Sequence, residues 1–324
     1  MNKNIFITRK IPEVGLKMLE EKGYSVTVRD SDMPPTQEEL NFALREKEYD
    51  AVVTLLTDKI DSAIFEANPN IKLYANYAIG FDNIDIVEAK NRGIYVTNTP
   101  GAYANCVAEH AIALMLALTT RLVEGDQYVR DGKYKCWSPD IFIGTDLSGK
   151  TLGLIGAGRI GEKVAWRLMH GFDMKIIYHD IVRNQTLDSE DRADYKTTIE
   201  EVLKEADIVT LHTPLLPETI HLINEERLKM MKPTAYLINT SRGPVIDENA
   251  LLKALKEGWI KGAGLDVMEF EPNPVSGLTD LDNVIITPHI ASARESARNE
   301  MATVLAENII DYFEGKEPRN NVAK

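Results

Sequence analysis

The chain has 324 residues, of which 44% are hydrophobic and 27% charged, and its formal net charge is −13. This length allows two domains with cores of their own, and the acidic balance argues against nucleic acid or an anionic membrane surface as a partner. Cys106 and Cys136 form no metal-ligand motif, the amino-terminal apolar stretch is too short for a signal peptide, and no run reaches the roughly 18 apolar residues of a membrane span. We therefore expect a cytoplasmic protein without a metal site.

The first hundred residues alternate between predicted strands and helices. Helices are predicted over 12–22 and after Thr36, which begins a capping box with Glu39. The predicted strands cover 4–8, 25–29, 51–55 and 71–77. This alternation predicts a parallel sheet covered by helices.

After residue 104 the alternation of short strands and helices stops. Residues 105–123 predict a long apolar helix, and residues 125–149 turn polar and irregular. The irregular stretch still carries Tyr134, Trp137, Ile141 and Phe142. Exposed aromatic side chains are common in subunit interfaces, so this stretch is a candidate interface.

Residues 152–180 follow the order strand, glycine turn, helix, strand, acid. The turn reads Gly156-Ala-Gly158-Arg159-Ile160-Gly161. In such a motif the first glycine permits the tight turn, the second lets phosphate approach the backbone, and the third lets the helix pack on the strand. Amides at the start of the helix then face an anion. The motif predicts a dinucleotide site.

Asp180, at the end of the second strand, bears on which dinucleotide binds. Its carboxylate can accept hydrogen bonds from the adenosine ribose and would repel a 2′-phosphate. This favours NAD (NADH) as the cofactor over NADP, although Arg183 leaves room for some use of NADPH.

The segment from Lys150 onwards predicts a complete second sheet. Its strands are expected at 152–156, 175–179, 207–211, 235–239, 262–266 and 284–287. A last long helix over 292–314 has no strand after it, so we expect it to pack on the first domain. The predicted fold is α/β, with two doubly wound parallel-sheet (Rossmann-like) domains. An NAD-binding Rossmann domain of residues 104–291 would be inserted into a flavodoxin-like substrate domain of residues 1–103 and 292–324, with the active cleft between the two connecting helices.

Several candidate catalytic side chains follow these later strands, where ligands bind in open α/β sheets. Arg242 can hold a carboxylate or keto oxygen through two parallel hydrogen bonds. His289 and His212 both end a strand, and either imidazole can exchange a proton with a carbonyl oxygen near neutral pH. Position alone favours His289 without deciding between them. His110, in the apolar helix, is expected to be a packed core residue.

Three carboxylates near residue 270 are candidates to orient such a histidine: Asp266, Glu269 and Glu271. A carboxylate hydrogen-bonded to imidazole holds the ring and balances its positive charge. We expect Glu269 to be a solvated surface acid.

Three later segments, together with the glycine turn, resemble the D-isomer-specific 2-hydroxyacid dehydrogenases. They are 231–247 (MKPTAYLINTSRGPVID), 264–272 (GLDVMEFEP) and 287–291 (TPHIA). The resemblance covers essentially the whole chain. Residues 76–85 and the stretch 125–149 look most like the glyoxylate and hydroxypyruvate reductase branch.

The resemblance implies a role for each candidate. The catalytic residues would be Arg242, which binds and orients a 2-oxo acid, His289, which supplies the proton, and Glu271, which stands immediately before a proline as the family's catalytic acid does. Asp266 matches an aspartate near the nicotinamide carboxamide. The stretch 125–149 matches an arm that embraces a second subunit, so a homodimer through region 105–149 is expected, with Trp137 or a neighbour reaching the partner's cleft. The implied substrate contacts are Ala78, Ile79, Gly80, Arg242 and His289. The implied cofactor contacts are Gly156, Gly158, Arg159, Ile160, Gly161, Asp180, His212, Thr213, Pro214, Thr240, Ser241 and Asp266.

The implied activity is NADH-dependent reduction of glyoxylate or hydroxypyruvate to the D-2-hydroxy acid, and its reverse. The alternatives are another D-2-hydroxyacid dehydrogenase, a phosphite dehydrogenase of the same frame, or an NAD-sensing binding protein. Ile79 stands where phosphite dehydrogenases carry a lysine, which argues against a doubly charged substrate.

Overall fold

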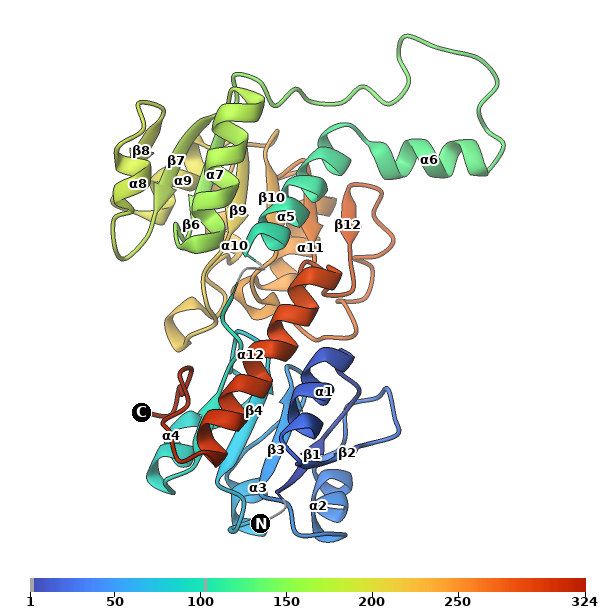
Figure 1. The fold of residues 1–324 in the computed structure, drawn as a ribbon. Helices are drawn as coiled ribbons and strands as arrows, with labels where there is room; N and C mark the ends of the chain where they lie inside the picture. The colour runs from blue at the N-terminus through green and yellow to red at the C-terminus, as the bar shows by residue number, and fades with distance from the viewer. Residues whose placement is uncertain (1–2, 102–103) are drawn as a thin grey trace. The chain divides into compact units, whose positions relative to one another are not determined.

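The computed structural model describes residues 3–101 and 104–324. It divides into two compact units, one of Met1–Ala102 with Ala293–Lys324 and one of Tyr103–Ser292 (Figure 1). The first unit therefore takes up the last segment of the chain. The roles assigned to the two domains stay predictions.

The first unit is a five-stranded parallel sheet in the order β2-β1-β3-β4-β5, the flavodoxin-like order. Its strands are β1 (Asn4–Ile7), β2 (Ser25–Val28), β3 (Ala51–Leu55), β4 (Leu73–Tyr77) and β5 (Tyr95–Thr97). Its helices are α1 (Glu13–Glu21), α2 (Gln37–Arg45), α3 (Ser62–Ala67), α4 (Ile86–Asn91) and α12 (Glu295–Phe313). The capping box is confirmed: Thr36 accepts from Glu39 N, and the Glu39 carboxylate accepts from Thr36 N.

Helix α12 returns to the first unit, as its sequence predicted. It lies along α1 and β4 (Figure 1). Gly15 of α1 allows this close approach, because a Cβ there would lie 2.7 Å from Ala302 O. The hydroxyl of Tyr77 donates to Arg298 O at 2.7 Å and joins β4 to the helix.

The second unit is a seven-stranded parallel sheet in the order β12-β11-β10-β9-β6-β7-β8. Its strands are β6 (Thr151–Ile155), β7 (Lys175–His179), β8 (Ala193–Tyr195), β9 (Ile208–Leu211), β10 (Tyr236–Asn239), β11 (Gly262–Leu265) and β12 (Val284–Ile286). Its α-helices are α5 (Ala104–Thr119), α6 (Leu122–Arg130), α7 (Arg159–Phe172), α8 (Gln185–Asp188), α9 (Ile199–Glu205), α10 (Glu225–Met230) and α11 (Glu248–Lys256), with 3₁₀ turns at Pro217–Thr219 and Gly243–Val245. The comparisons with solved structures given below confirm the doubly wound fold.

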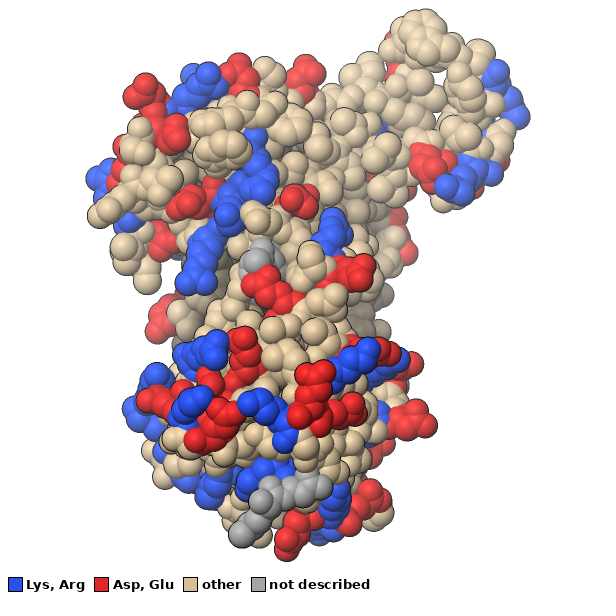
Figure 2. All heavy atoms as spheres, viewed as in Figure 1, with Lys and Arg blue, Asp and Glu red and all other residues tan. Residues whose placement is uncertain are grey.

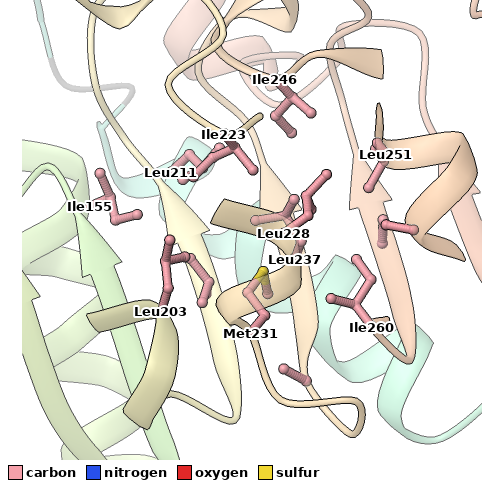
Figure 3. Packing of buried hydrophobic residues seen from close by; sticks show 14 of the residues in the cluster. Ile155, Leu203, Leu211, Ile223, Leu228, Met231, Leu237, Ile246, Leu251 and Ile260 are labelled. Carbon is pink, nitrogen blue, oxygen red and sulfur yellow. The ribbon is translucent and has the colours of Figure 1, made fainter. Parts of the chain in front are cut away.

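Both faces of the second sheet are covered by helices. On one face Ile155, Leu211 and Leu237 pack with residues of α9, α10 and α11 such as Leu203 and Leu251 (Figure 3). On the other face α5 and α7 cover the sheet, with Met115 and Leu168 fully buried. Burial on both faces explains why these strands read as continuous apolar runs. It also makes the carboxyl edge of the sheet a rigid support for loops.

The expectation of an irregular stretch over 125–149 is wrong for its first part, because α6 extends to Arg130. None of the residues of α6 is buried, and its apolar side chains Leu122, Val123 and Val129 are exposed, so this helix is not held by packing on the second unit. Pairs such as Arg130–Asp126, one turn apart, support it instead.

No single helix in the described ranges is long and apolar enough to cross a membrane; α5 and α6 meet that criterion only together, and a bend of 61° separates them. Over the face shown in Figure 2, acidic and basic side chains are interspersed on both units.

Candidate active site

The candidate residues of the second unit follow neighbouring strands at one edge of its sheet. Along the order β12-β11-β10-β9-β6-β7, His289 follows β12, Glu271 follows β11 and Arg242 follows β10. His212 follows β9, the glycine turn follows β6, and Asp180 follows β7. The order of successive strands reverses between β6 and β9, since β6 to β8 extend to one side of the sheet and β9 to β12 to the other. Ligands bind in such sheets at the carboxyl edge beside this point.

The three glycines of the turn have different surroundings. Gly156 has a φ of +94°, and a Cβ there would lie 2.7 Å from the carbonyl carbon of His212. A Cβ at Gly161 would lie 2.3 Å from Gly156 O. A Cβ at Gly158 would meet nothing within 4 Å. The fold itself therefore needs glycine at 156 and 161, whereas position 158 borders open space.

The amino terminus of α7 has the properties of an anion site. Gly158 is its N-cap residue and supplies no side-chain hydrogen bond to it. Gly158 and Arg159 are exposed, and Ile160 is partly buried. The first amides of this 14-residue helix are therefore available to a bound phosphate.

Asp180 is fixed beside the glycine turn. Its Oδ2 accepts a hydrogen bond from Ala157 N at 2.7 Å, and its Oδ1 accepts from Val182 N at 3.3 Å. Arg183 is held elsewhere, since its Nε and Nη2 donate to the two carboxylate oxygens of Asp188 at 2.9 and 3.1 Å. Its guanidinium also lies over the ring of Tyr195.

His212 cannot act as the proton donor near neutral pH. Its Nε2 lies 3.0 Å from Thr210 Oγ1, and its Nδ1 is buried without a hydrogen-bond partner among the described residues. Burial lowers the pKa of His212 to about 3, so the ring stays neutral. This removes the rival that position alone had left open beside His289.

Three buried polar atoms near this edge have no partner within the part of the chain that the structure describes: His212 Nδ1, Thr213 Oγ1 and Thr240 Oγ1. They follow the adjacent strands β9 and β10, and Pro214 beside them is exposed. Buried polar groups are nearly always hydrogen-bonded, so such a cluster fits a polar ligand that completes the bonds. Together with the exposed amides of α7, this donor and acceptor set suits a dinucleotide.

His289 and Glu271 form a pair. His289 Nδ1 lies 3.2 Å from Glu271 Oε2, and Met268 N donates to Glu271 Oε1 at 3.2 Å. His289 has a φ of +54°, an unusual conformation for a residue with a side chain. The contact with Glu271 engages Nδ1 and leaves Nε2 as the ring atom suited to proton transfer.

Arg242 is brought next to the Glu271 segment by its neighbour Gly243. A Cβ at Gly243 would lie only 1.9 Å from Met268 O, so the two backbones are in direct contact. The Asn239 side chain holds the turn: its Nδ2 donates to Arg242 O, and its Oδ1 accepts from both the amide and the hydroxyl of Ser241. Sequence reasoning missed Asn239, whose side-chain bonds within the turn become evident only once the turn is formed.

Asp266 is fully buried, and its carboxylate is engaged within the protein. It accepts from Thr287 Oγ1 at 2.6 Å and from the amides of Ile290 and Ala291 at 2.8 Å each, and His110 Nε2 lies 3.3 Å away. Burial acts to raise the pKa of Asp266, but hydrogen bonds led by that of His110 outweigh it and lower the pKa. The contact of Asp266 with nicotinamide stays a prediction.

The expectation that Glu269 is a solvated acid is wrong. Its side chain is only 9% exposed, and it accepts from Glu248 N at 3.0 Å and pairs with His221 at 2.6 Å. The buried Glu248 reciprocates by accepting from Glu269 N and Val275 N. The segment after β11 folds over the start of α11, which the local sequence does not reveal.

The remaining substrate candidates, Ala78, Ile79 and Gly80, follow β4 in the first unit. Their carbonyl oxygens accept hydrogen bonds from Thr99 N, from the Asn98 side chain and from the Asn76 side chain, respectively. The conformation of this loop is therefore fixed within its own unit.

The comparisons with known proteins agree on a family. Residues 112–291 match the family model described as D-isomer specific 2-hydroxyacid dehydrogenase, NAD binding domain. The chain is 49% identical to a glyoxylate reductase of Pyrococcus furiosus, over 100% of this chain and 96% of that one. It is 51% identical to a glyoxylate reductase of Thermofilum pendens, over 97% and 92%.

Solved structures show the same fold. A protein of Thermus thermophilus has a TM-score of 0.91 at 42% identity, with 98% of this chain and 99% of that one covered. An NADPH-dependent glyoxylate/hydroxypyruvate reductase of Sinorhizobium meliloti, in complex with NADP and malonate, has a TM-score of 0.86 at 31% identity, covering 100% and 97%. With its glycine turn, its paired His289 and Glu271 and these relatives, the chain belongs to the D-isomer specific 2-hydroxyacid dehydrogenases.

Proposed function

We propose that the chain reduces glyoxylate or hydroxypyruvate to the D-2-hydroxy acid with NADH, and catalyses the reverse reaction. The observation that carries this proposal is the His289–Glu271 pair at 3.2 Å, on the same sheet edge as the glycine turn. The relatives named glyoxylate reductase support the substrate class. Residues 104–291 then form the NAD-binding domain, and residues 1–103 with 292–324 the substrate domain.

Each residue of the site has a part in this chemistry. The amides at the start of α7 would hold the pyrophosphate, and Asp180 the adenosine ribose. His212, Thr213, Thr240 and Ser241 follow β9 and β10, towards the nicotinamide end. A bound nicotinamide cofactor supplies or accepts the hydride.

The protein's own side chains then manage the substrate and the proton. Arg242 binds the keto end of the 2-oxo acid through its planar fork of donors, and the backbone of residues 78–80 meets the carboxylate. His289 Nε2 donates a proton to the carbonyl oxygen as the carbonyl carbon accepts hydride. Glu271 holds Nδ1 and balances the charge of the ring. In the reverse direction His289 takes the proton back.

Preference for NADH over NADPH rests on Asp180 and Arg183. A 2′-phosphate beside Asp180 would face a carboxylate, while Arg183, the candidate cation three residues further on, is paired with Asp188. The relative from Sinorhizobium meliloti is NADPH-dependent, so the family accommodates both cofactors. We expect a higher kcat/KM with NADH, and Asp180→Ser to raise the relative use of NADPH.

We also propose a cytoplasmic homodimer formed through region 105–149. Trp137 is 76% exposed, and Tyr134 and Ile143 of the same segment are also exposed. Ile141 and Phe142, expected to be exposed as well, are partly buried, and the Phe142 ring packs against Tyr128. Large apolar side chains gathered on one segment are typical of a protein interface. Trp137 or a neighbour would then reach the partner's substrate cleft.

The deciding experiment is NADH oxidation with glyoxylate, hydroxypyruvate, pyruvate and bulkier 2-oxo acids, each repeated with NADPH. We expect the highest kcat/KM with glyoxylate or hydroxypyruvate, and loss of turnover in His289→Ala with NADH binding retained. Reduction of NAD by phosphite would favour the phosphite dehydrogenase alternative. Tight NADH binding without turnover of any of these acids would favour an NAD-sensing protein.

A further inference from the structure

The turn that carries His289 is held by a single carboxylate. Asp266 accepts hydrogen bonds from Ile290 N, Ala291 N and the Thr287 hydroxyl. The backbone oxygen of Asp266 also accepts from His289 N at 2.8 Å. The left-handed conformation of His289 is therefore fixed from both sides, and the position of its ring depends on where the Asp266 carboxylate points.

His110 reaches this network from α5, more than 150 residues away in the sequence. Its Nε2 lies 3.0 Å from Thr287 Oγ1 and 3.3 Å from Asp266 Oδ1, and its side chain is 12% exposed. Because the Thr287 hydroxyl donates to Asp266, its oxygen is left to accept. A hydrogen on His110 Nε2 can therefore be shared between both acceptors, which defines the tautomer of the ring.

We propose that His110 is a positioning residue for the proton transfer proposed above: its Nε2–H orients the Thr287–Asp266 pair, which in turn sets His289 against Glu271. A histidine that only filled this space would also need its ring nitrogens hydrogen-bonded, so the experiment has to separate the donor at Nε2 from the bulk of the ring. Its hydrogen bond also adds to those that keep Asp266 an acceptor, because it is the leading interaction that lowers the pKa of this carboxyl group.

The test compares two substitutions that differ in one donor. His110→Gln keeps an N–H near the position of Nε2, whereas His110→Leu keeps bulk without a donor. We expect the leucine variant to lose about 10- to 100-fold in kcat, as a small displacement of a catalytic group does, with smaller changes in NADH affinity and in the KM for glyoxylate. The glutamine variant should recover most of kcat. His170→Leu, at an exposed histidine of α7, serves as the control for replacing an imidazole by leucine and should leave kcat unchanged.

Two further measurements separate positioning from mere stability. Thr287→Val combined with His110→Leu should cost little more than either change alone, because both remove the same network. The ¹⁵N spectrum of the His289 ring, assigned with His289→Gln, should shift in the leucine variant but not in the glutamine variant. This readout needs no turnover, so it tests the proposal even if the proposed activity fails. Equal loss of kcat in both His110 variants, with a matching fall in Tm, would overturn the proposal, as would an unshifted His289 spectrum in the leucine variant.

Discussion

Replacing Gly158 by alanine separates the space that the cofactor needs from the space that the fold needs. A Cβ at position 158 would meet nothing within 4 Å, and the φ of −73° there suits any residue. At Gly161 a Cβ would lie 2.3 Å from Gly156 O and 2.7 Å from Leu154 Cδ2. The two alanine variants should therefore fail in different ways.

The expected magnitudes follow from these distances. Gly158→Ala should change the free energy of unfolding by less than about 0.5 kcal/mol, because a slightly poorer N-cap is offset by lower entropy of the unfolded chain. It should raise the Kd for NADH about 10-fold or more, equivalent to at least ~1.4 kcal/mol, since the methyl group occupies the approach to the α7 amides. Gly161→Ala should cost about 1–3 kcal/mol of stability, because α7 must move away from the turn by roughly 1 Å.

Thermal denaturation of the ligand-free protein and titration of NADH fluorescence measure the two effects separately. The fall in Tm should be about 2–4 °C for each kcal/mol lost. Gly171→Ala, also in α7 and also without neighbours within 4 Å, is the control and should leave NADH binding unchanged. Wild-type affinity in Gly158→Ala would refute the placement of the pyrophosphate at this turn. A loss of stability equal to that of Gly161→Ala would refute the reasoning about space.

Three other expectations follow from the site and the surface. His289→Ala should lower kcat roughly 10²- to 10⁴-fold with NADH affinity retained, as the loss of a general acid does; near-normal steady-state turnover would contradict its assignment. His212 has a folded pKa of about 3 against an ordinary 6.5, so the unfolded chain takes up a proton that the folded protein does not, and the free energy of unfolding falls as pH drops between these values. His212→Asn should reduce that acid-induced loss by a few kcal/mol in urea titrations at several pH values, and an unchanged pH dependence would count against burial of the ring. Sedimentation should show a dimer, and Trp137→Ala should weaken it; a wild-type monomer at micromolar concentration would reject the interface.

Local patterns were enough to predict most of the elements. The apolar runs of the second unit, the capping box at Thr36 and the returning helix at 292–314 are all present. They were predictable because strand burial, helix capping and the glycine turn depend on residues a few positions apart. The strands β5 and β8 were missed: each has three residues, and Ala193–Tyr195 also lacks the apolar run that marks the equally short β12. Helix α6 was missed because it has no buried face.

Sequence patterns alone predicted an insertion of the second unit into the first and the strand ends that carry Arg242, Glu271 and His289. The environment of each side chain becomes evident only in the folded chain, where the Glu269 side chain is 9% exposed, His212 stays neutral, and His110 lies beside Thr287 and Asp266. The reason is physical. A motif records which residues follow one another, but burial and hydrogen bonding are set by groups that meet only after folding, and His110 and Thr287 are 177 positions apart. The chemistry of a side chain depends on those distant neighbours as much as on its own identity.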